Sequence, residues 1–176
     1  MVDKLIQFVS HCGIKDVEVF QLEHRQIVLE ERVRFNCFFC RNYSNKWCCP
    51  PNIPDLDYSR VLQEYDNFLL LTYKYGFDGE ITTEDRTLST NIVHKLGLEL
   101  EKFLWENNHP LAKVFIGGGC KLCGYTCPMD ECSKPTMRRL PLEAIGVNVV
   151  KTAGNIGIDI VFPPKNYFYR VGLLLW

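Results

Sequence analysis

Two short cysteine-rich segments constrain the fold of this chain more than any other feature. Eight of its nine cysteines fall into these segments, the first group being Cys37, Cys40, Cys48 and Cys49 and the second Cys120, Cys123, Cys127 and Cys132. Glycines or prolines stand beside both groups, as in Gly117–Gly119, Pro50–Pro51 and Pro128. Because these residues interrupt helices and strands, both groups are expected in loops.

Charge and hydropathy exclude several classes of function. Twenty basic and 21 acidic side chains give a net charge of −1, so no strong positive field exists to attract a nucleic acid. The first twenty residues mix charged and apolar side chains, unlike a signal peptide, and no later run resembles a membrane span. We therefore expect a cytoplasmic protein that binds neither nucleic acid nor membrane.

Because the cytosol keeps thiols reduced, its cysteine groups are expected to bind metal. Cys12, outside both groups, is expected in the core.

Hydrophobic periodicity predicts helices that alternate with strands. Strands are expected over residues 17–22, 27–35, 68–75, 111–116 and 167–175, and helices over 5–10, from Pro54, over 85–107 and over 142–145. The long helix has an apolar stripe formed by Leu88, Ile92, Leu96, Leu100, Phe103 and Leu104. The pattern predicts one small α/β domain over residues 1–176, with a mixed sheet, flanking helices and two cysteine-rich metal-binding loops.

The spacing of the second group favours an iron-sulfur cluster. Two, three and four residues separate its successive cysteines, which places four thiols within thirteen positions. Zinc is usually held by two close pairs about a dozen or more residues apart, whereas one compact loop can wrap around a 4Fe-4S cluster. Gly118 and Gly119 would let backbone N–H groups approach its sulfides. Zinc and free thiols remain alternatives.

The first group is expected to provide three ligands. Neighbouring side chains of an extended chain point to opposite sides, so Cys48 and Cys49 are not expected to bind the same centre. Pro50 and Pro51 fix the backbone after Cys49, which favours Cys49 as the ligand alongside Cys37 and Cys40. Three thiolates would leave one iron of a cluster open. Zinc bound by all four cysteines, or by three with a carboxylate or histidine, is the alternative.

A basic pair follows the second group. Arg138 and Arg139 would neutralise the charge of a cluster or dock an acidic partner, although an ordinary solvated pair explains them as well. Glu143 stands one helical turn beyond Arg139 and is expected to pair with it. Gly118, Gly119 and Arg139 are therefore the candidate cofactor contacts besides the cysteines.

The ordered combination of motifs resembles a known family. It comprises Cys37-x2-Cys40-x2-Tyr43, Cys49-Pro50-Pro51, Gly118-Gly119-Cys120-x2-Cys123-x3-Cys127, Cys132-x2-Pro135, Arg139 and Glu143-Ala144-x-Gly146-Val147. From Cys37 onward the chain is similar to the predicted metal-binding proteins called domain of unknown function 2284. The resemblance implies metal binding, iron-sulfur in type, and names no reaction. Ser44, Cys48 and Asn148 depart from its pattern, where glycine, a non-cysteine and aspartate are common.

Three functions fit these observations. The first is a redox module in which one or two 4Fe-4S clusters pass electrons to or from a partner protein. The second is an enzyme that uses an open cluster at Cys37, Cys40 and Cys49 for sulfur or small-ligand chemistry. The third is a scaffold organised by zinc. No Ser-His, Cys-His or His-Glu pattern indicates an independent catalytic mechanism, so the redox module is preferred.

Overall fold

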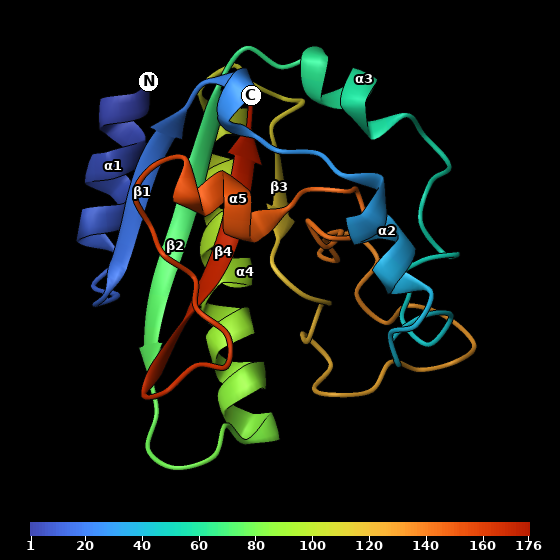
Figure 1. The fold of residues 1–176 in the computed structure, drawn as a ribbon. Coiled ribbons are helices and arrows are strands. Elements are labelled where there is room, and N and C mark those ends of the chain that lie inside the picture. Colours follow the sequence, from blue (N-terminus) through green and yellow to red (C-terminus); the bar gives the residue numbers. More distant parts are fainter.

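The computed structural model describes residues 1–176 and has a four-stranded sheet at its centre (Figure 1). Its elements are α1 (Val2–His11), β1 (Val17–Leu22), the 3-10 helix η1 (His24–Gln26), α2 (Glu31–Cys37), α3 (Tyr58–Gln63), β2 (Phe68–Gly76), α4 (Thr83–Glu106), β3 (Lys113–Ile116), α5 (Val149–Gly154) and β4 (Tyr167–Leu175). The strand order is β1-β2-β4-β3, and all three ladders are antiparallel. The one parallel pairing is an isolated bridge between Ile116 and Pro141. The predicted α/β class with flanking helices is confirmed, but the sheet, which was predicted to be mixed, is antiparallel in all its ladders. None of the helices combines the length and the hydropathy needed to cross a membrane.

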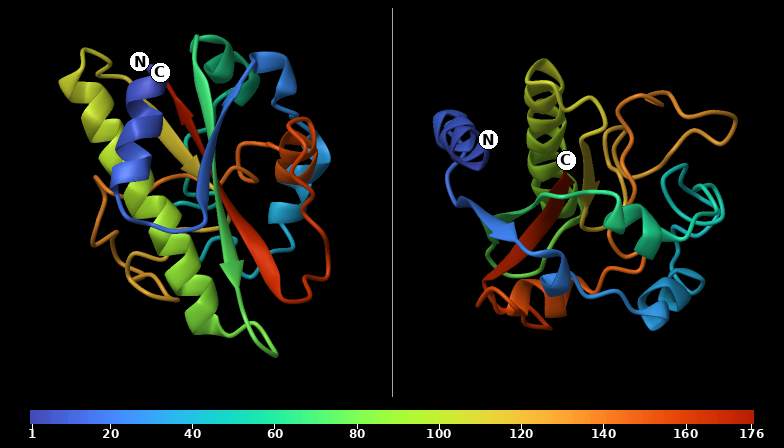
Figure 2. Two further views of the ribbon diagram at one scale, coloured as in Figure 1. Left: turned by 90° about the vertical axis from the view of Figure 1, so that its left-hand side faces the viewer. Right: turned by 90° about the horizontal axis from the view of Figure 1, so that it is seen from above.

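The two faces of the sheet carry separate hydrophobic cores. Successive residues of a strand point to opposite faces, so Leu69 and Leu71 pack beneath α1 and α4, whereas Phe68 and Leu70 pack with α3, α5 and the segment around Ile145. Figure 2 shows α1 and α4 on one side of the sheet and the shorter helices on the other. This three-layer arrangement leaves the two cysteine segments outside both cores.

Helix α4 packs closely on β3 and β4. Thr82 caps its first turn, where the Thr82 Oγ1 accepts the backbone N–H of Asp85 at 3.0 Å. Gly97 faces β3, and a Cβ there would stand 2.8 Å from Val114 Cγ1, so only glycine allows this approach. The predicted stripe is correct at Leu96, Leu100 and Leu104 but wrong at Leu88, which is 51% exposed because Ser89 and Thr90 face the sheet instead.

The predictions for two segments were wrong. Residues 27–35 contain only a bridge between Leu29 and Val147, and α2 begins at Glu31 because no further strand lies alongside to accept pairing. Residues 142–145 form a turn closed by Ala144 N–H and the Pro141 carbonyl at 3.0 Å, whereas the helix α5 begins later, after the Asn148 cap. Helix α3 exists as predicted but begins at Tyr58 rather than at Pro54, because the side chain of Asp57 supplies the capping oxygen.

Both cysteine segments lie beyond β3, at one edge of the sheet (Figure 1). The second group follows β3 directly through Gly117, whose N–H donates to the Val171 carbonyl of β4 at 2.6 Å. The first group begins at the last residue of α2, Cys37. The start of α2 is tied to the turn at 146–148, because Glu30 N–H donates to the Gly146 carbonyl at 2.8 Å. These two attachments hold the segments side by side.

Candidate metal centre

The eight grouped cysteines surround two adjoining pockets. The first pocket has a volume of about 370 Å³, and its cysteines are Cys37, Cys40 and Cys49. The second pocket has five cysteines in its lining: Cys48, Cys120, Cys123, Cys127 and Cys132. Thus the structure brings together the three thiols expected at one site and the four expected at the other, and it adds Cys48 to the second set. Cys12 lies apart at the end of α1 and is exposed, so its predicted place in the core was wrong.

The thiols are spread around these pockets. No three side chains of the metal-binding types converge closely enough to hold a single ion as they are placed. The second pocket encloses only about 10 Å³ of free space, close to what one water molecule needs. A bound cluster would therefore have to widen the loop over residues 121–139, which contains no helix or strand. The first pocket is already wide enough to admit a larger group.

Cys48 and Cys49 mark the boundary between the pockets. They are adjacent in the chain and buried, with their Sγ atoms 3.8 Å apart, yet each lines a different pocket. Backbone N–H of Cys120 donates to Cys48 Sγ at 3.3 Å. Gly119 lies against Cys49, where a Cβ would come within 3.3 Å of the Lys46 side chain. Cys49 thus lines the first pocket with Cys37 and Cys40, and the expectation that Cys49 rather than Cys48 is their fellow ligand stays a prediction.

The surroundings of Cys48 favour its thiolate. A hydrogen bond from Cys49, the N–H of Cys120 and the charge of Lys46 together lower the pKa of Cys48 to about 7, despite its burial. The neighbouring Cys48 and burial raise the pKa of Cys49, and burial raises the pKa of Cys120 to about 11. A Cys48 thiolate therefore places negative charge at the boundary between the two pockets.

Lys46 places a buried positive charge between the two pockets. The side chain is only 4% exposed, and its Nζ donates to the Cys120 carbonyl at 2.8 Å. No carboxylate pairs with it. A buried, unpaired ammonium is costly unless negative charge lies nearby. Thiolates and an anionic metal centre would supply that charge, so the donor set and its surroundings fit a metal-thiolate group.

Glu143 is a member of the first pocket that sequence reasoning did not place there. Its carboxylate accepts the N–H of Gly118 at 3.0 Å, and burial raises its pKa. Gly118 adopts a positive φ of 77°, a conformation that favours glycine, and so directs its N–H at this carboxylate. The oxygen donors of Glu143 could complete a site that has only three thiols. The sequence did contain an indication that Glu143 has a special role, because it is the only charged residue between Leu140 and Val150.

The basic pair divides between two roles. Arg139 does not pair with Glu143 as predicted, because its guanidinium binds the buried carboxylate of Glu101 on α4, with Nε 2.6 Å from Oε1. It lines neither cysteine pocket. Arg138 does line the second pocket, and its Nη1 donates to the Trp47 carbonyl at 3.3 Å. Of the other two candidate cofactor contacts, Gly118 and Gly119 both line the first pocket.

Comparison with known proteins gives one match. Neither the curated proteins nor the solved structures include one that matches the chain. A family model described as predicted metal-binding protein (DUF2284) matches residues 21–176, which include both cysteine groups, Lys46 and Glu143. The chain therefore belongs to the DUF2284 family of predicted metal-binding proteins.

Proposed function

We propose that the two cysteine pockets hold iron-sulfur clusters of the 4Fe-4S type and that the protein transfers electrons. The observation that carries this proposal is the division of Cys48 and Cys49 between the pockets, with their sulfurs 3.8 Å apart. The two pockets meet at these adjacent residues, so clusters within them would be neighbours and an electron would have a short path between them.

The residues have distinct parts in this proposal. Cys120, Cys123, Cys127 and Cys132 would hold the second cluster, and Cys37, Cys40 and Cys49 the first. A 4Fe-4S cluster supplies one-electron redox chemistry, and hydrogen bonds and nearby charges set its potential. Lys46 and the N–H of Cys120 would stabilise the negative charge that a cluster gains on reduction.

A redox partner is part of the same proposal. Phe35, Phe38 and Phe39 are between 61% and 70% exposed, and their rings contact one another at the end of α2. Cys40, which follows them, is also exposed. Exposed apolar clusters of this kind are typical of protein interaction sites. A partner that docked here would reach the first cluster.

Anaerobic purification followed by iron, sulfide and zinc analysis tests the proposal. Two clusters would give about eight iron and eight sulfide per chain and a broad band near ~400 nm from sulfide-to-iron charge transfer. Cys12→Ser is the matched control, because Cys12 is exposed and outside both pockets. Colourless protein with stoichiometric zinc and no sulfide would instead support the zinc scaffold.

The first pocket favours a second candidate, an enzyme with an open iron. Only three thiols line this pocket, and Glu143 is the additional donor within it. An iron without a fourth thiolate can bind an exogenous ligand and is readily lost on oxidation. Cyanide or a small thiol added to the reduced protein would then change the paramagnetic resonance spectrum of one cluster only, and Glu143→Gln would enlarge that change. If the spectrum of neither the wild type nor Glu143→Gln changes, the enzyme reading is rejected and an electron carrier with no open iron is supported.

A further inference from the structure

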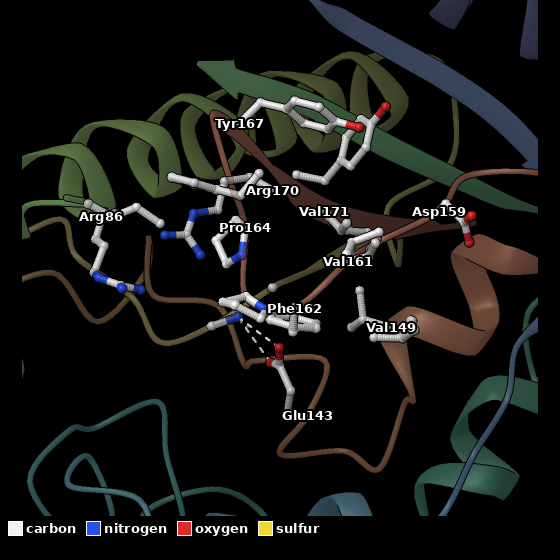
Figure 3. Close-up of a pocket in the computed structure, with 18 of the residues that line it drawn as sticks. Arg86, Glu143, Val149, Asp159, Val161, Phe162, Pro164, Tyr167, Arg170 and Val171 are labelled. Atoms are coloured by element: carbon white, nitrogen blue, oxygen red, sulfur yellow. Dashed lines mark hydrogen bonds between the residues drawn. The ribbon is translucent and has the colours of Figure 1, made fainter. Parts of the chain in front are cut away.

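A third cavity lies on the other side of the Gly118–Glu143 wall from the first cysteine pocket. It has a volume of about 660 Å³, in the range of small-molecule sites, and lies between the first turns of α4, strand β4 and the segment that precedes β4. Figure 3 shows Arg86 and Arg170 extending into one side of it. Gly118 and Glu143 line both this cavity and the first cysteine pocket, so a ligand here would lie beside that pocket.

Arg170 presents unused hydrogen-bond donors to the cavity. Its Nε donates to Ser89 Oγ at 3.0 Å, and its guanidinium lies 4.7 Å from the centre of the Phe168 ring. The two terminal nitrogens have no protein acceptor, and no carboxylate pairs with Arg170 or Arg86. Burial and the charge of Arg86 lower the pKa of Arg170 to about 10, which leaves it charged at neutral pH. A partly buried guanidinium with free donors favours an anion.

The other lining residues define the rest of a ligand. Lys165 adds a third positive charge, and Phe162, Tyr167 and Val171 provide apolar surface. Two acids also line the cavity. Glu143 is engaged by Gly118 N–H, and Asp159 lies at the end away from the arginines (Figure 3). Charge and hydropathy are therefore separated along the cavity.

We propose that this cavity binds a small organic oxyanion, a carboxylate or phosphate ester on an apolar body. The anionic group would bind the guanidinium groups of Arg170 and Arg86, which suit planar, bidentate recognition of such oxygens. The apolar body would lie along Phe162 and Tyr167. This binding goes beyond the proposed electron transfer and does not require a metal to be present.

Calorimetric titration of the purified protein with phenylacetate, phenyl phosphate and neutral benzyl alcohol tests the proposal. Saturable binding of at least one anion, with none of the alcohol, is expected, and the two anions distinguish a carboxylate from a phosphate ligand. Arg170→Met should weaken binding by about tenfold or more, because a charge-assisted hydrogen bond is lost, and Arg170→Lys should restore part of it.

Further variants keep the result interpretable. Arg86 is exposed, so Arg86→Met should fold even if Arg170→Met does not, and it should weaken binding as well. Arg60→Met removes an exposed charge outside the cavity and should leave binding unchanged. Absence of binding at millimolar concentration, equal binding of benzyl alcohol, or insensitivity to both cavity arginines would overturn the proposal. Measuring iron in each sample separates the two proposals. If iron-free protein binds the anion, only the cluster proposal is rejected. If cluster-loaded protein does not bind the anion, only the proposed anion site is rejected.

Discussion

At the scale of single residues, the boundary between the cysteine pockets combines a buried cation with two adjacent thiols. Lys46 hydrogen-bonds to the Cys120 carbonyl, and its charge favours the thiolates of Cys48, Cys49 and Cys120. In a region with few water molecules, such charges act strongly on one another. Substitution of Lys46 should therefore have a large effect on the charge balance of both pockets.

The adjacent cysteines should give separable effects. We expect Cys49→Ser to remove the metal of the first pocket, because only Cys37 and Cys40 would remain there. Cys48→Ser should retain the full metal content, because four other cysteines line the second pocket. Iron analysis with paramagnetic resonance of the reduced proteins measures both effects. The opposite ranking of iron content would make Cys48 a ligand.

Lys46 should raise the reduction potential of the proposed clusters. Lys46→Met removes one positive charge, and a pair of charges a few ångströms apart at an effective dielectric of 20 interacts by a few kcal/mol. We expect the potential to fall by about 100–150 mV, because ~59 mV corresponds to a tenfold change in equilibrium for one electron. Redox titration measures it, with Lys4→Met at the exposed start of α1 as the control. An unchanged potential would place the clusters away from Lys46.

The sequence alone identifies the cysteines as candidate ligands, but it does not predict which residues surround them. The argument that Cys48 and Cys49 point apart assumed an extended chain, whereas the segment forms turns and the two sulfurs lie 3.8 Å apart, although each lines a different pocket. Lys46 carries no such signal, because its burial depends on the second cysteine loop folding over it. Arg139 could not be assigned either, since Glu101 on α4 is its partner and lies distant in the chain.

At the scale of elements, Glu30 connects α2 to α5. Its carboxylate accepts hydrogen bonds from Arg32, Asn148 at 2.9 Å and Lys151 at 2.5 Å. The connection fixes where α2 begins, and α2 ends at Cys37. Asn148, where the family pattern often has aspartate, donates here, and a carboxylate in its place would repel Glu30. The placement of the first cysteine group thus depends on an ionic contact of Glu30 at the start of α2, at the opposite end of the helix from Cys37.

Acid should weaken this contact. Hydrogen bonds from Arg32, Lys151 and Asn148 lower the pKa of Glu30 from 4.5 to about 2. Since the folded pKa is depressed, its contribution to stability is complete above about pH 4.5 and is lost as the pH falls towards 2. Glu30→Gln should be less stable at pH 7 and lose less stability over that interval. Urea unfolding at several pH values checks this, with the exposed Glu31→Gln as control.

The elements that local pattern could predict were those with long or alternating apolar runs. Strands β1, β2 and β4 and helix α4 lie where periodicity placed them. The segment 27–35 looked like a strand because apolar residues alternate there, but a strand requires a neighbour, and the turn at 146–148 provides only a single bridge. Helix α5 was missed because its start is set by the Asn148 cap, which a short apolar run does not reveal.

At the scale of the whole molecule, the metal loops and the two cores are separate. Cys48, Cys49, Ile116 and Cys120 form a small buried cluster of their own, apart from the clusters on the two faces of the sheet. Most of the apolar burial that stabilises the fold therefore does not involve the cysteines. The sheet and its helices should remain folded when the metal is removed.

Removing the metal should loosen the loops selectively. After chelation under reducing conditions, we expect the cooperative unfolding of the sheet to persist, while proteolysis rates rise within residues 38–57 and 117–139. Mass spectrometry of the cleavage products locates the cuts, and metal-loaded protein is the control. Early cleavage within α4 or β2 would show instead that the whole fold depends on the metal.

The position of β4 affects how the protein is assembled during synthesis. This strand lies between β2 and β3, and Phe68 at the start of β2 pairs with Leu175. Both cysteine groups precede β4 in the chain, so a ribosome has made all eight thiols before the central ladders can form. Such distant pairing also slows folding. During that interval the second cysteine loop lacks its attachment to β4 through Gly117 and Val171, so its thiols should be more open to oxidation than in the folded protein.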